Sequence, residues 1–227
     1  MIILRRPVLG DHLQRGVYDQ SICNQAGPID IVFVLDGSGS VEAKERNQER
    51  FSDIIDFVKQ VTKNLNLGPG ATRVAVVQYG DFEFKVEIPF THSASRLNFD
   101  SIVYQAEIKK DVGTRTGRAI EFATQELIQK FARKNAKTKM IVVTDAKSED
   151  YVDEAANEAR AKGVEMIAVG FSKNTRWTSA KICTLDALEF CQLQDIANDP
   201  DEGHLFMGGI GNNYEYLVSQ VSAAACS

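Results

Sequence analysis

The stretch Ile29-Asp30-Ile31-Val32-Phe33-Val34-Leu35, followed at once by Asp36-Gly37-Ser38-Gly39-Ser40, decides the fold. Its first part is apolar at almost every position, which is typical of a strand buried on both faces, as in a parallel sheet. The residues after it are small and polar, and its two glycines allow the backbone to bend. The stretch therefore predicts a central parallel strand that ends in a polar loop.

Strands and helices are expected to alternate along the rest of the chain. Residues 84–90 alternate apolar and charged side chains, which indicates a half-exposed edge strand in a hairpin. The other expected strands are 73–79, 140–143, 164–169 and 204–207, and the expected helices are 41–65, 97–105, 118–133, 151–162, 185–197 and 214–224. This order predicts one α/β domain with a doubly wound, mostly parallel sheet, one antiparallel edge strand and helices on both faces. We assign residues 1–27 to an N-terminal extension and 28–226 to the domain.

The composition excludes several classes of protein. The chain has 227 residues, of which 44% are hydrophobic and 25% charged, as in an ordinary soluble domain. Its net charge of −5 argues against a generally basic surface for nucleic acid. No apolar run is long enough to span a bilayer. Arg5 and Arg6 interrupt the apolar start before a signal-peptide core forms, so we expect a cytosolic protein, a processed form or a fragment.

The four cysteines favour an extracellular location. Cys23 precedes the first strand and Cys226 is the penultimate residue, while Cys183 and Cys191 lie close together. An even count in these positions indicates two disulfides, one joining the ends of the domain and one closing a local loop. Four free thiols in a cytosolic protein are the alternative. A zinc site is disfavoured, because no Cys-x-x-Cys pair is present and the chain has only 3 histidines.

Short oxygen-bearing side chains follow the ends of expected strands or precede a helix. Asp36, Ser38 and Ser40 come after the first strand, Thr114 stands in a glycine-bounded loop, and Asp145 follows the strand at 140–143. In an open α/β sheet, ligands bind at the carboxyl ends of the strands. Two carboxylates and three hydroxyls suit a hard cation such as Mg²⁺, and leave a place for a carboxylate from outside. Alternatively, the serines cap a helix and the threonine is a turn residue.

Three of these segments carry a resemblance to a known family. Val34–Ser40 resembles the Asp-x-Ser-x-Ser motif of von Willebrand factor type A domains, Gly113–Ile120 is similar to the family's second loop, and Ile141–Asp145 resembles its third element. The resemblance covers roughly residues 28–222 and is nearest to the matrilin and collagen VI branch. The family commonly has glycine after the last Asp, where this chain has Ala146.

The resemblance implies a metal-ion-dependent adhesion site (MIDAS). It would hold Mg²⁺, or Mn²⁺ or Ca²⁺, on the following ligands: Asp36, Ser38, Ser40, Thr114 and Asp145. It also implies an end-to-end bridge, Cys23–Cys226, which leaves Cys183–Cys191 as the second disulfide. We therefore expect a secreted extracellular-matrix module for cell adhesion. It would dock an acidic residue of a matrix protein, with collagen as one candidate partner.

The segment from Phe171 to Cys191 is a candidate surface for the partner. It follows a strand that should end on the same face as the metal, and Trp and Arg are favoured anchors in interfaces. The candidate contact residues are Ser172, Lys173, Asn174, Arg176 and Trp177. The alternative is that Trp177 simply packs its own loop.

An enzyme is the first competing interpretation. Mg²⁺-dependent phosphohydrolases need a second acid two residues after the strand-ending Asp, and Ser38 stands there. Neither a phosphate-binding loop nor a Gly-x-Ser-x-Gly motif is present. We therefore expect no catalytic residue, no small-molecule substrate, no nucleic acid and no membrane insertion. Two further competing interpretations are an intracellular assembly module and a structural matrix domain whose binding is metal-independent.

Overall fold

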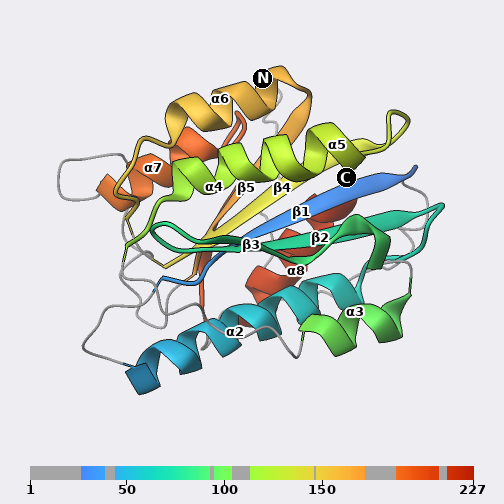
Figure 1. The fold of residues 1–227 in the computed structure, drawn as a ribbon, viewed down its shortest axis with the longest axis horizontal. Helices are drawn as coiled ribbons and strands as arrows, with labels where there is room; N and C mark the ends of the chain where they lie inside the picture. Colours follow the sequence, from blue (N-terminus) through green and yellow to red (C-terminus); the bar gives the residue numbers. More distant parts are fainter. Residues whose placement is uncertain are drawn as a thin grey trace, which may run out of the picture.

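Strand β1 (Ile29–Asp36) lies in the middle of the sheet, as its sequence predicts (Figure 1). In the computed structural model, residues 27–38, 44–92, 95–103, 113–145, 147–171, 188–209 and 214–227 are described. Parallel strands flank β1 on both sides, β2 (Thr72–Tyr79) on one and β4 (Lys137–Thr144) on the other. All of β1 is buried, because helices cover both of its faces as well.

Three more strands complete a six-stranded sheet of order β3-β2-β1-β4-β5-β6. Strands β5 (Val164–Phe171) and β6 (Leu205–Gly208) continue the parallel part beyond β4. Strand β3 (Phe84–Ile88) runs antiparallel to β2 at the other edge. The predicted α/β class, with one antiparallel edge strand, is thus confirmed.

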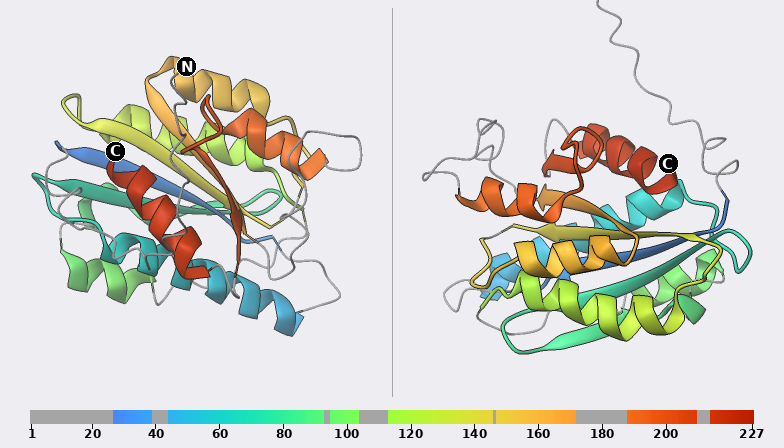
Figure 2. Two further views of the ribbon diagram at one scale, coloured as in Figure 1. Left: turned by 180° about the vertical axis from the view of Figure 1, so that it is seen from behind. Right: turned by 90° about the horizontal axis from the view of Figure 1, so that it is seen from above.

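Helices cover both faces of the sheet, as the edge-on view in Figure 2 shows. One core holds side chains of α2 (Lys44–Lys63), α3 (Arg96–Val103) and α8 (Tyr214–Cys226). The opposite core holds side chains of α4 (Thr116–Phe122), the π-helical turn Ala123–Ile128, α6 (Asp153–Ala161) and α7 (Leu188–Ile196). A short helix α5 (Gln129–Phe131) continues the π-helical turn, and a 3₁₀ turn, Phe90–His92, follows β3. Across these described ranges, no helix is both long and apolar enough to cross a membrane.

The predicted helix at 118–133 begins two residues earlier than expected, at Thr116. Its first N–H groups donate hydrogen bonds to Ser148 and Asp150, which are more than 30 residues away in the chain. A cap supplied from so far away leaves no local signal in the sequence. By contrast, the predicted end of α6 is confirmed, because Gly163 follows it with φ +80°, a conformation that favours glycine. The residues 41–43, 104–105 and 185–187 of other expected helices lie outside the described residues.

Asp30 interrupts the apolar run of β1 and is held by two arginines. Arg73 donates from Nε to Oδ1 over 2.8 Å and from Nη2 to Oδ2 over 2.6 Å. Arg133 donates its backbone N–H over 2.6 Å and its Nε over 3.0 Å. Burial alone would raise the pKa of Asp30, but these bonds outweigh it and the pKa is lowered. The buried carboxylate therefore ties β1 to β2 and to the chain between α5 and β4.

Candidate metal-binding site

Four of the five predicted ligands lie in the described part of the chain. Asp36 ends β1, Ser38 lies two residues later, Thr114 stands two residues before α4, and Asp145 directly follows β4. Since β1 and β4 are parallel neighbours, Asp36 and Asp145 leave the sheet at the same edge. The fifth predicted ligand, Ser40, lies outside the described residues.

Direct hydrogen bonds join three of these residues. The hydroxyl of Thr114 donates to Ser38 Oγ over 2.8 Å. The backbone N–H of Ser38 donates to Asp36 Oδ1 over 2.9 Å. The other oxygen of that carboxylate, Oδ2, accepts from the hydroxyl of Thr144 over 2.6 Å. The loop after β1 and the loop before α4 are thus brought together around oxygen donors.

Gly37 lets the loop after β1 pass close to β2. Its N–H donates to the carbonyl of Tyr79 over 2.8 Å. A Cβ at this position would lie 2.3 Å from the side-chain nitrogen of Gln78, which is buried. A side chain at residue 37 would therefore force Gln78 to move, which explains glycine between Asp36 and Ser38.

Two carboxylates close to each other dominate the electrostatics of the site. Asp36 is buried, and its pKa is raised to about 6, first by desolvation and then by the charge of Asp145. Hydrogen bonds from Ser38 and Thr144 offset only part of this shift. Burial, followed by the charge of Asp36, also raises the pKa of the Tyr79 hydroxyl well above its usual value. A bound divalent cation would remove the repulsion between the two carboxylates.

The donor set fits a hard cation. Within the described residues, no group of three or more His, Cys, Asp or Glu side chains is placed to hold a metal. The predicted site instead combines Asp36 and Asp145 with hydroxyl groups, and its donors are all oxygen. Mg²⁺, Mn²⁺ and Ca²⁺ prefer oxygen ligands of this kind to the sulfur and nitrogen ligands that cysteine and histidine supply.

Residues that the sequence did not single out surround Thr114. Its carbonyl accepts from the N–H of Glu149 over 2.7 Å, and the hydroxyl oxygen of Ser148 lies 3.3 Å from the same carbonyl oxygen. Gln192, on α7, pairs with the backbone of Ser148. These residues are far from Thr114 in the sequence, and no spacing or motif marks them.

An exposed aromatic side chain lies beside the same loop. Phe82, in the turn between β2 and β3, is 67% exposed. The guanidinium carbon of Arg115 lies 4.7 Å from the centre of its ring, and Arg115 also forms an ion pair with Asp81. The predicted partner contacts Ser172, Lys173, Asn174, Arg176 and Trp177 lie outside the described residues, as does Ala146.

The described cysteines are bonded. Neither Cys191 nor Cys226 is a free thiol. Cys23 and Cys183, their predicted partners, lie outside the described residues. The pairing Cys23–Cys226 and Cys183–Cys191 therefore stays a prediction.

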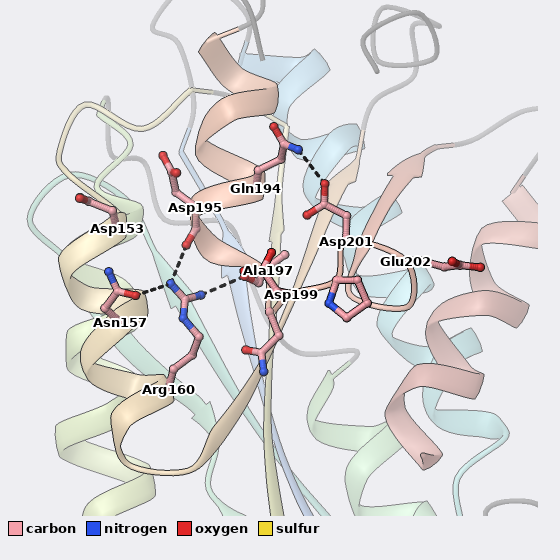
Figure 3. A pocket seen from close by; sticks show the side chains of 11 residues that line it. Asp153, Asn157, Arg160, Gln194, Asp195, Ala197, Asp199, Asp201 and Glu202 are labelled. Carbon is pink, nitrogen blue, oxygen red and sulfur yellow. Dashed lines mark hydrogen bonds between the residues drawn. The ribbon is translucent and has the colours of Figure 1, made fainter. Parts of the chain in front are cut away.

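Apart from the candidate metal site, a polar pocket lies between α6, α7 and the loop before β6 (Figure 3). Its acidic lining residues are Asp153, Asp195, Asp199, Asp201 and Glu202. Arg160 lies among them and donates to the carbonyls of Asp195 and Ala197 over 3.0 Å each. Burial, and then the charge of Asp153, raises the pKa of Asp195. Arg160 therefore has a clear structural role, because it caps the carbonyl end of α7 and offsets the surrounding negative charge.

Comparison with known proteins identifies the family. Residues 30–220 match the model of the von Willebrand factor type A domain, so the chain belongs to this family, as the sequence motifs predicted. It is 34% identical over 189 residues to the collagen alpha-1(XXI) chain of Xenopus laevis, covering 82% of this chain and 17% of the relative. It is 30% identical over 233 residues to matrilin-3 of Gallus gallus, covering 98% of this chain and 46% of the relative. This chain thus spans less than half of either protein.

A solved structure with the same fold carries a metal. It is proximal thread matrix protein 1 from the mussel byssus, described with a zinc-occupied MIDAS motif. The TM-score is 0.67 at 22% sequence identity, and the match covers 91% of this chain and 47% of the other. At this identity the likeness establishes the fold alone. The collagen and matrilin relatives are secreted proteins of the extracellular matrix, which confirms the predicted location.

Proposed function

We propose that this chain is a metal-ion-dependent adhesion module of the extracellular matrix that docks an acidic residue of a matrix protein onto a divalent cation. The proposed ligands are Asp36, Ser38, Ser40, Thr114 and Asp145, and the cation is Mg²⁺, or Mn²⁺ or Ca²⁺. The proposed domain comprises residues 28–226 after an extension of 27 residues. Collagen is the matrix protein we would test first, and we propose no enzymatic activity.

The observation that carries the proposal is the hydrogen bond between the hydroxyls of Thr114 and Ser38, over 2.8 Å. Two hydroxyls from separate loops face each other beside the carboxylate of Asp36, whose Oδ1 accepts from the N–H of Ser38. The arrangement supports a shared ligand for both hydroxyls, and a hard cation is the ligand that such oxygens prefer.

The balance of charge supports a carboxylate as the docked group. Two aspartates offset the two charges of the cation, so a site with only Asp36 and Asp145 has no surplus negative charge to repel an incoming acid. When bound, the cation would supply a Lewis-acidic position for a partner's Glu or Asp. The stacked pair Arg115 and Phe82 lies beside Thr114 and offers the partner a cationic and an apolar contact.

The comparisons support the same function. A neighbour with this fold is described with zinc in its MIDAS motif, and the similar collagen and matrilin chains are matrix proteins. Because this chain spans only part of those relatives, its partners are proposed from the site rather than from their names.

Binding of the chain to an array of matrix proteins, in Mg²⁺ and in EDTA, tests the proposal. We expect the wild-type chain to bind at least one matrix protein in Mg²⁺ and to lose that binding in EDTA. The variant Thr114→Ala should lose the same binding even in Mg²⁺. Thr91→Ala is the matched control, because its hydroxyl is exposed and pairs with the ring of the neighbouring His92, which is not part of the proposed site. Binding that persists in EDTA would contradict the proposal and favour a structural matrix domain. Calorimetric titration of chelator-treated protein with Mg²⁺ and Mn²⁺ tests metal binding directly.

A further inference from the structure

The segment Ser148–Asp150 fastens the start of α4, and with it Thr114. The hydroxyl of Ser148 accepts from the N–H of Thr116 over 3.0 Å and donates to Asp150 Oδ1 over 2.6 Å. Asp150 in turn accepts from the N–H groups of Gly117 and Arg118, over 2.9 Å each. The first three amides of α4 are therefore satisfied by this one segment, and none by a local cap.

The same segment holds the backbone of Thr114 itself. The carbonyl of Thr114 accepts from the N–H of Glu149 over 2.7 Å. The start of α4 packs closely against this segment, because a Cβ on Gly117 would lie 2.0 Å from the carbonyl oxygen of Tyr151. The position of Thr114 therefore follows the position of residues 148–151.

Residue Ser148 is held by a side chain from α7. The N–H of Ser148 donates to Gln192 Oε1 over 2.8 Å, and Gln192 Nε2 donates back to the carbonyl of Ser148 over 3.2 Å. An amide side chain paired in this way copies the hydrogen bonding of a neighbouring strand. Helices α4, α6 and α7 lie on the same face of the sheet and contribute to the same core (Figure 1). Gln192 therefore links the segment at Ser148 to a helix that is itself packed in this core.

We propose that Gln192 and Ser148 are positioning residues for Thr114, so that α7 sets the place of the proposed metal-binding hydroxyl. The consequence for metal affinity rests on the proposed function, but the positioning itself does not. A displacement of α7 would act on Ser148 first, then on the amides of residues 116–118, and then on Thr114. Gln192 also follows Cys191 directly, so a bonded cysteine restrains the same turn of α7.

The test compares Gln192→Ala with Gln194→Ala in the whole chain. Gln194 lies on the same helix, but its amide donates to Asp201 over 2.6 Å, away from Thr114. In metal-free protein, we expect amide hydrogen exchange across residues 113–118 to rise about fivefold in Gln192→Ala, the size expected for losing one or two hydrogen bonds. It should stay unchanged in Gln194→Ala. Exchange in β1 and β4 should stay at the wild-type rate in both variants.

Titration with Mn²⁺ is the second measurement. We expect the affinity of Gln192→Ala to fall by about tenfold, as for other residues that orient a metal ligand, and that of Gln194→Ala to stay at the wild-type value. Gln192→Glu keeps the oxygen that accepts from Ser148 and should restore part of the protection. Unchanged exchange at 113–118 in Gln192→Ala would overturn the inference. If wild-type protein binds no Mn²⁺, the proposed function fails, and the exchange data still decide whether Gln192 positions Thr114.

Discussion

The hydroxyl of Thr114 donates a hydrogen bond to the hydroxyl of Ser38 across 2.8 Å, although the two residues are 76 positions apart in the chain. The sheet brings them together. Asp36 pairs in register with Tyr79 of β2, and the hydroxyl of Tyr79 contacts Thr116 at the start of α4 over 2.8 Å. The loop of Thr114 is therefore placed by β2 on one side and by Ser148 on another.

Removing the charge of Asp145 should separate metal binding from stability. Asp145→Asn deletes a proposed ligand and, in metal-free protein, also deletes the charge that repels Asp36. We expect no Mg²⁺ or Mn²⁺ binding at millimolar concentration. We also expect the metal-free melting temperature to stay level or rise, by no more than about 4 °C.

Calorimetry and thermal unfolding in EDTA measure the two effects. Asp100→Asn is a matched control, because its carboxylate is 38% exposed on α3 and makes a long contact of 3.9 Å to Arg96. It should keep wild-type metal affinity. A variant Asp145→Asn that binds Mn²⁺ as the wild type does would remove Asp145 from the ligand set.

Gly117 is predicted to tolerate no side chain. A Cβ there would meet the carbonyl oxygen of Tyr151 at 2.0 Å, and a backbone atom cannot move aside as a flexible side chain can. Gly117→Ala should destabilise the protein by about 1–3 kcal/mol. It should also weaken Mn²⁺ binding, because residues 148–151 hold Thr114.

Gly70→Ala provides the matched comparison in chemical denaturation. No atom lies within 4 Å of a Cβ at Gly70, so the change should be neutral or stabilise by about 0.4–1 kcal/mol. Equal destabilisation by both substitutions would show that the close approach of Gly117 to Tyr151 does not cause the loss of stability.

Much of the fold is predictable, because β1 and its parallel neighbours are buried along most of their length and so are mostly apolar. The alternation in Phe84–Ile88 marks an edge strand for the opposite reason, since Lys85 on its polar side stays exposed. The short polar loop after Asp36 stands out against this pattern. Its place at a strand end predicts the candidate site.

The residues that hold the site in place cannot be predicted from the sequence in the same way. Ser148, Asp150 and Gln192 act through hydrogen bonds to backbone groups of distant segments. In the sequence, a serine, an aspartate or a glutamine at these positions looks like any surface residue. Only the packing of α4 against α6, and of α6 against α7, brings it to its partner. The early start of α4 escapes prediction for the same reason.

Arg160 should stabilise α7 in a salt-dependent way. It donates to the carbonyls of Ile196, Ala197 and Asp195, among acidic side chains that line the pocket in Figure 3. Arg160→Gln removes the cap and leaves the acids to repel one another. We expect a loss of about 2–3 kcal/mol at low salt, and a smaller loss at about 0.5 M NaCl, because salt screens exposed charges. Urea unfolding at both salt concentrations measures this, and a loss that salt does not change would leave only the cap as the cause.

Asp30 is predicted to stabilise the protein at neutral pH and to lose that effect in acid. It is buried, and Arg73 and Arg133 both donate to its carboxylate. Asp30→Asn leaves two partly buried guanidinium groups without a counter-charge. At pH 7 we expect a cost of about 3–5 kcal/mol in the free energy of unfolding.

The pH dependence follows from the direction of the shift. Because the folded protein lowers the pKa of Asp30, the unfolded chain takes up this proton first as the pH falls. The stabilisation is therefore complete above the ordinary pKa of 3.8, shrinks below it, and is lost once the pH falls through the lower folded value. Urea unfolding of wild type and Asp30→Asn at pH 7, 5 and 3 should show a constant difference between the first two and a smaller one at pH 3. A difference that stays the same down to pH 3 would mean that folding does not lower the pKa of Asp30, and that its role in β1 is one of packing alone.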